Sequence, residues 1–248
     1  MTRNLKVLGL ALVASLALSA MVASAASGSA ALFTSSVGAT ETAKIHGEQV
    51  GTDTFTVNGI PLTCATAPVT GEAKTTGSSS TYVEVTPVYG TCHAIVPFIG
   101  TRTATVTMNS CRYTFNATKN TNSSSTGPTP NVATPFSSDL HITCANAGDG
   151  IEVHVYNTAN ASDAGSTVFC TYKIDPQTVL NQIQLTNEAP AGGVTDILAH
   201  VHANVSTTFI SGSGGFTCGS GTITSVYKGT DTLTATNAAG ASVNSSVS

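Results

Sequence analysis

Residues 104–115 have the sequence Ala-Thr-Val-Thr-Met-Asn-Ser-Cys-Arg-Tyr-Thr-Phe, and this stretch decides the predicted fold. Small or apolar side chains alternate with threonine as far as Met108, and an alternation returns at Cys111. A period of two is typical of a half-buried β-strand. The inward positions are even-numbered before residue 109 and odd-numbered after residue 110. The sequence therefore predicts a β-bulge at Asn109–Ser110.

The same alternation recurs along most of the chain. It is clearest at Leu140–Cys144, Ile151–Tyr156, Val168–Ile174 and Asp196–Val205. Threonine fills most outward positions, where its branched side chain suits a pleated surface. Many short strands at this spacing favour an all-β, antiparallel β-sandwich of immunoglobulin-like or Greek-key type. One helical turn is expected, at Pro176–Gln184.

The composition excludes several classes of protein. Charged residues make up 9% of the 248 residues, and the formal net charge is −4. A soluble domain usually has about a quarter of its residues charged. A nucleic-acid partner held by a basic face and a coiled coil flanked by Glu and Lys are therefore excluded. Simple disorder is not indicated either, because 41% of the residues are hydrophobic.

The first 25 residues have the pattern of an export signal. Arg3 and Lys6 precede an apolar run, Val7–Val22, and Ala23-Ser24-Ala25 then provides a small-x-small cleavage site. The run is shorter than the roughly 20 residues that span a bilayer, so no membrane span is expected once the signal is removed. The sequence predicts a secreted, extracellular protein.

Signal removal leaves residues 26–248, which we expect to form one β-sandwich domain. The polar, low-complexity segment 118–137 is either a long hairpin loop of this domain or a linker. As a linker it would join two halves, 26–117 and 138–236. Residues 237–248 are expected to be a flexible tail.

Six cysteines in an exported chain predict three disulfides. Hairpin geometry favours Cys64–Cys92 and Cys111–Cys144, because the midpoint of each pair falls in a turn-forming stretch; Cys170–Cys218 then follows by elimination. Similar tripeptides around the cysteines favour instead the pairs 64–111 and 144–170. Each bridge would stabilise the fold by about 3 kcal/mol.

Three segments, Val85–Cys92, Ala104–Phe115 and Cys170–Gln177, carry a pattern of cysteines and turn residues. In this pattern the chain resembles an uncharacterised family of secreted, disulfide-bonded actinobacterial β-proteins. The resemblance implies export and a disulfide-bonded β-sheet. It implies no activity, because the shared motifs contain no catalytic chemistry.

The strongest candidate site is the pair His200 and His202. Residues two apart share one face of a strand, so both imidazoles would lie on the outward side. With a third ligand, His154 or Glu152, they could bind zinc or copper. Solvated histidines on an exposed sheet are the simpler interpretation. Tyr156 is a candidate for binding a glycan or small ligand beside His154. No cofactor is expected.

The chain has no G-x-S-x-G, H-E-x-x-H or P-loop motif. We therefore expect a non-enzymatic, secreted or cell-surface protein that acts by contact, adhesion or assembly, with a cell-surface partner or with itself. A first alternative is an extracellular module that binds a small ligand, a glycan or a metal. A second is a secreted hydrolase whose site is not visible in the sequence.

Overall fold

The computed structural model describes residues 31–118, 136–160, 162–188, 194–213 and 218–248. The predicted export signal and nearly all of segment 118–137 lie outside these residues. The described residues form eighteen strands. They are β1 (Phe33–Ser35), β2 (Lys44–Gln49), β3 (Thr54–Val57), β4 (Ile60–Thr66), β5 (Val69–Ala73), β6 (Ser79–Ser80), β7 (Tyr82–Pro87), β8 (Gly90–Val96), β9 (Gly100–Thr107), β10 (Cys111–Thr118), β11 (Phe136–Cys144), β12 (Ile151–Tyr156), β13 (Val168–Ile174), β14 (Gln177–Glu188), β15 (Asp196–Ser211), β16 (Thr222–Thr236), β17 (Ser242–Val243) and β18 (Ser245–Val247).

Every strand pairing is antiparallel, so the predicted all-β, antiparallel class is confirmed. The helical turn expected at Pro176–Gln184 is wrong, because Gln177 begins the twelve-residue strand β14. The ladder with β11 satisfies the backbone of this segment better than an isolated turn would. In the part of the chain that the structure describes, no helix is long and apolar enough to cross a membrane.

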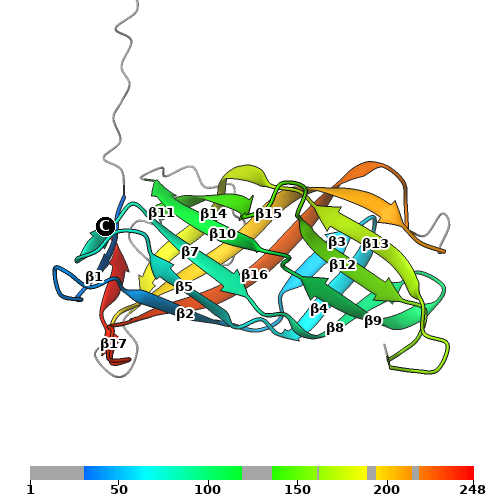
Figure 1. Ribbon diagram of the computed structural model, residues 1–248, viewed down its shortest axis with the longest axis horizontal. Coiled ribbons are helices and arrows are strands. Elements are labelled where there is room, and N and C mark those ends of the chain that lie inside the picture. Colours follow the sequence, from blue (N-terminus) through cyan, green and yellow to red (C-terminus); the bar gives the residue numbers. More distant parts are fainter. Residues whose placement is uncertain (1–30, 119–135, 161, 189–193, 214–217) are drawn as a thin grey trace, which may run out of the picture.

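Fifteen of the strands belong to one sheet whose two ends meet (Figure 1). In one half of the molecule the order around the ring is β16-β2-β5-β7-β10-β11-β14-β15, and in the other half it is β16-β3-β4-β8-β9-β12-β13-β15. The long strands β15 and β16 pair along both halves and close the ring. The strand order therefore shows a single closed sheet and does not show the expected immunoglobulin-like sandwich of two sheets.

The two halves are continuous because most strands pass from one half into the other after a short break. For example, β10 pairs with β11 while β9 pairs with β12, so the chain keeps its direction through residues 108–110 and 145–150. The breaks on neighbouring strands lie opposite one another. Asn109 and Ser110, where the bulge was predicted, have positive φ angles of 42° and 62°. This irregularity lets both halves of the strand turn their apolar side chains inward.

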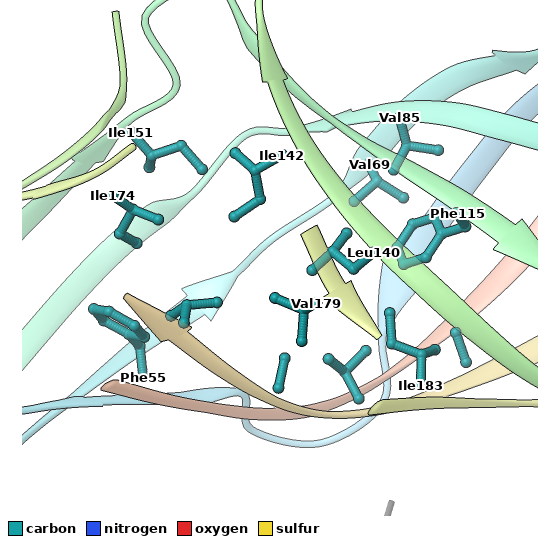
Figure 2. Packing of buried hydrophobic residues seen from close by; sticks show 14 of the residues in the cluster. Phe55, Val69, Val85, Phe115, Leu140, Ile142, Ile151, Ile174, Val179 and Ile183 are labelled. Carbon is teal, nitrogen blue, oxygen red and sulfur yellow. The ribbon is translucent and has the colours of Figure 1, made fainter. Parts of the chain in front are cut away.

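The interior of the ring is filled by the inward side chains of the alternating strands. Figure 2 shows such residues from several strands gathered in this interior. Ile151, Val153 and Val155 of β12, which the alternation predicted to face inward, are no more than 1% exposed. Burial of apolar surface on this one face is the main stabilising contribution to the closed sheet.

Three disulfides fasten neighbouring parts of the ring. Cys64–Cys92 and Cys111–Cys144 each join directly opposed residues of two paired strands. Cys170–Cys218 joins β13 to the segment before β16. These are the pairs that hairpin geometry favoured. Three disulfides indicate an oxidising environment.

A small sheet of β1, β6 and β18 lies at one end of the ring, beside β17 (Figure 1). Residues 237–248, expected to be a flexible tail, contain β17 and β18, and Val247 is 1% exposed. Strands from both sides of segment 118–137 belong to the same ring, so the halves 26–117 and 138–236 share their core.

Candidate functional site

The interior of the ring contains a cavity of about 80 Å³. Most of the side chains that line it are aliphatic or aromatic. The polar side chains among them form a group that we call the Asp–Tyr cluster: Asp53, Tyr89, Tyr113, Tyr227 and Asp231. An apolar cavity with a few convergent polar groups is the usual form of a small-molecule site.

The alternation of β16 places two members of the cluster inside. Asp231 lies two residues before Leu233 and four before Ala235, which are 4% and 0% exposed. It therefore shares their inward face. Tyr227 lies on the same face, four residues earlier, and both it and Asp231 line the cavity. An aspartate thus occupies an inward position of β16, where the alternation of the strand predicts an apolar side chain.

Asp53 enters the cavity from the break between β2 and β3. It is 4% exposed, and its carboxylate accepts hydrogen bonds from the Tyr227 hydroxyl at 2.7 Å and from the backbone N–H of Thr230 at 3.3 Å. Gly229 makes this position possible, because a Cβ atom there would collide with Oδ1 of Asp53. The two hydrogen bonds fix the direction of the carboxylate.

Tyr89, in the break between β7 and β8, and Tyr113, on β10, complete the cluster. Their hydroxyl oxygens are 3.1 Å apart, and either can donate to the other. Burial raises the pKa of Tyr113 to about 12 and raises the pKa of Tyr89 well above its ordinary value. Both phenols therefore stay protonated at neutral pH and can donate or accept hydrogen bonds.

Asp231 is the group of the cluster that titrates near neutrality. Burial, and secondarily the charge of Asp53, raise the pKa of its carboxyl group to about 7. Burial also raises the pKa of Asp53, although the bonds from Tyr227 and Thr230 oppose this effect. Within the described ranges no side chain or N–H group donates a hydrogen bond to Asp231. Its carboxylate is thus free to bind a proton or a positively charged ligand.

The histidines singled out from the sequence lie elsewhere. His200 and His202 are on the outward face of β15, but His200 is 5% exposed, and its Nδ1 lies 3.2 Å from the Thr230 hydroxyl. Burial lowers the pKa of His200. It is therefore not the solvated histidine of an exposed sheet.

The structure does not bring His154 to this pair. His154 is on β12, which β13 separates from β15, and its Nε2 is 3.4 Å from the Glu152 carboxylate. The described residues contain no group of three or more His, Cys, Asp and Glu side chains that could hold a metal ion. Tyr156, at the end of β12, is half-buried and does not line the cavity.

A second hollow, of about 310 Å³, lies on the outer face over β5, β7 and β10. Its charged wall is already compensated, because Glu84 binds both Lys74 at 2.7 Å and Arg112 at 3.2 Å. The two cations lower the pKa of Glu84 against the effect of its burial. This hollow offers no uncompensated charge to a ligand, unlike the Asp–Tyr cluster.

Sequence reasoning missed the Asp–Tyr cluster, because its members come from four different regions of the chain and two of them lie in strand breaks. One signal was present: Asp231 stands at an inward position of the alternating stretch 230–236. A carboxylate at such a position is a candidate functional group.

Comparison of the chain with protein-family models, with curated proteins and with solved structures finds no match. The fold and the site together define a disulfide-bonded, antiparallel closed sheet with an acidic and aromatic interior cavity. Its function is therefore argued from this geometry.

Proposed function

We propose that the protein is an extracellular, non-enzymatic binding protein that takes a small molecule into the interior of its ring. The observation that carries this proposal is the apolar cavity with the Asp–Tyr cluster in its wall. Closed sheets of about eight strands have interiors wide enough for side chains or for one small ligand. The predicted export signal and the three disulfides support a location outside the cell.

The chemistry of the cavity favours binding over covalent catalysis. Its described lining contains no Ser, His or Lys, and its one cysteine, Cys64, is in a disulfide, so the usual serine, cysteine and lysine nucleophiles are absent from it. The one hydroxyl that is bound to a carboxylate is that of Tyr227, and burial raises its pKa well above the ordinary value. Two carboxyl groups in one cavity are also what a glycosidase requires. However, about 80 Å³ is far below the roughly 300–1,000 Å³ of most ligand pockets. The proposal is therefore limited to ligands of a few heavy atoms.

The test is a titration of the full chain with a panel of small polar and apolar molecules, followed by NMR of the methyl groups of interior Val, Leu and Ile residues. We expect saturable shifts confined to residues that line the cavity. Ala199 lines the cavity and is 1% exposed, so Ala199→Ile fills part of the space and should abolish the shifts.

Leu198→Ile, on the outward face of the same strand, is the matched control and should leave binding unchanged. Thermal unfolding of both variants shows whether they are folded. Binding that survives in a folded Ala199→Ile protein, or the absence of shifts with the whole panel, would overturn the proposal.

A second candidate function is contact, adhesion or assembly through the outer surface. Phe98 is fully exposed at the tip between β8 and β9, and Ile95 and Ile99 beside it are exposed as well. Exposed apolar side chains gathered in one place are typical of interaction surfaces. Sedimentation of the wild-type protein over a range of concentrations tests self-association, and a glycan array tests binding to cell-surface sugars; monomers throughout and a silent array would contradict this candidate.

A further inference from the structure

We infer that the ligand of the interior cavity is a small organic cation, a primary ammonium group on a short apolar body. This inference rests on the proposed function and specifies its substrate class. Three features of the cavity carry it: uncompensated negative charge, unused hydrogen-bond acceptors and aromatic walls.

The negative charge inside the ring has no counter-ion from the protein. Asp53 and Asp231 both line the cavity, and the described lining residues include no Lys, Arg or His. A buried charge is costly unless it is paired. Asp53 receives two hydrogen bonds, but Asp231 receives none from the described residues. A cation beside Asp231 would supply the missing partner.

The Asp231 carboxylate is an acceptor that no described group uses. Gln49 does not line the cavity, but its Oε1 is also buried with no hydrogen-bond partner among the described residues. Gln49 is the cross-strand neighbour of Asp231 in the β2–β16 ladder, and its Nε2 already donates to Gly51 and Cys64 carbonyls. A primary ammonium group has three donors and no acceptor. It therefore complements the Asp231 carboxylate, whereas the negative charge of the two aspartates would repel an anion.

The remaining walls suit an organic cation better than a metal ion. Tyr89, Tyr113 and Tyr227 line the same cavity, and aromatic rings attract cations by their quadrupole. Val69, Val85 and Leu233 also line it, and they would pack against an alkyl chain. Calcium needs six to eight oxygen ligands, and magnesium keeps several waters. A largely aliphatic wall provides for neither ion.

Protons compete with such a ligand. The titratable groups that face Asp231 across the cavity are Asp53, Tyr89, Tyr113 and Tyr227, and the three phenols stay neutral far above pH 7. The pKa of Asp231 is about 7. Its carboxylate is therefore mostly ionised at pH 8 and mostly protonated at pH 5.5. Ammonium affinity should fall by at least about tenfold between these two values.

The experiment is calorimetric titration of the full chain with n-butylammonium and with 1-butanol, which has nearly the same shape but no charge. At pH 8 we expect n-butylammonium to bind and 1-butanol to bind at least about tenfold more weakly, the size of one lost charge-assisted hydrogen bond. Asp231→Asn removes the charge and should abolish the preference for the cation. Glu48→Gln makes the same charge change on the exposed face of β2 and should leave binding unchanged.

Each other outcome has a definite meaning. Equal binding of 1-butanol and n-butylammonium overturns the cation inference while the proposed interior binding stands. Unchanged cation preference in a folded Asp231→Asn protein also overturns it. If neither compound binds, and the wider panel of small molecules gives no NMR shifts, both the inference and the proposed function fail.

Discussion

The Asp231 carboxyl group is held where its ionisation costs free energy. Its pKa in the folded protein is about 7, against an ordinary value of 3.8. Well below pH 4 the group is protonated in both the folded and the unfolded chain. As the pH rises from 4 to 7, the unfolded chain loses this proton first, and the folded state is progressively destabilised. The difference approaches about 4 kcal/mol above pH 7.

Asp231→Asn should therefore stabilise the protein at pH 8 and leave its stability nearly unchanged at pH 4. We expect the free energy of unfolding at pH 8 to rise by about 2–4 kcal/mol, since the amide carries no charge to desolvate. Urea unfolding at the two pH values measures this. Glu48→Gln, on the exposed face of β2, should have little effect at either pH. Equal stabilities of Asp231→Asn and wild type at pH 8 would contradict the prediction.

Gly229 has no side chain because the carboxylate of Asp53 occupies that space. Gly229→Ala should push Asp53 away from the Tyr227 hydroxyl and the Thr230 N–H, at a cost of about 2–3 kcal/mol. Chemical denaturation of the single and double variants measures the cost. If Asp53 is the cause, Gly229→Ala should be nearly neutral in an Asp53→Ala background. The same penalty in both backgrounds would show that the collision is not the origin.

At the scale of the element, the alternation predicted which face of each strand is buried but not where each strand ends. The irregularities at Asn109–Ser110 and 145–150 interrupt the pattern without reversing the chain. The first irregularity was predicted as a bulge, but the many short alternating stretches of the chain favoured a sandwich. Two packed sheets and one closed sheet both bury one face of every strand. The pairings that close the ring, β15 with β16 and β16 with β3, distinguish the closed sheet from a sandwich, and neither pairing is visible in the sequence.

The breaks also explain why the candidate site was harder to predict than the fold. Asp53 and Tyr89 lie in breaks, where no alternation indicates whether a side chain faces inward. Asp231 and Tyr227 follow the alternation of β16, but their pairing with the other members depends on closure of the ring. The outward face of His200 and His202 was foreseen from the period of two. The burial of His200 was not, because it depends on neighbours distant in sequence.

At the scale of the whole molecule, closure of the sheet leaves few free strand edges. Few charged side chains are then needed on the outer surface to prevent pairing with other chains. An open edge is a template for pairing with another chain, and a ring of paired strands removes this hazard. Charged residues are 9% of the chain, and exposed ion pairs such as Lys44–Glu72 contribute little. Apolar burial and three disulfides must therefore provide most of the stability.

The small sheet at one end of the ring should be part of this stability, and Val247 tests it. Val247 is 1% exposed, and its backbone exchanges two hydrogen bonds with the Asn187 side chain, at 2.7 and 2.8 Å. Val247→Ala leaves these bonds in place but removes buried methyl groups, so we expect a loss of about 2 kcal/mol. Val88→Ala, at a side chain 65% exposed, should cost less than about 0.5 kcal/mol.

Hydrogen exchange of the Val247→Ala protein measures which strands lose protection. Faster exchange should appear in β14 and β15 near Asn187, because β18 contacts both strands there, and not in β8 and β9 at the other end of the ring. Uniform acceleration over the whole ring would mean that the end does not open separately, and that the closed sheet unfolds as one unit.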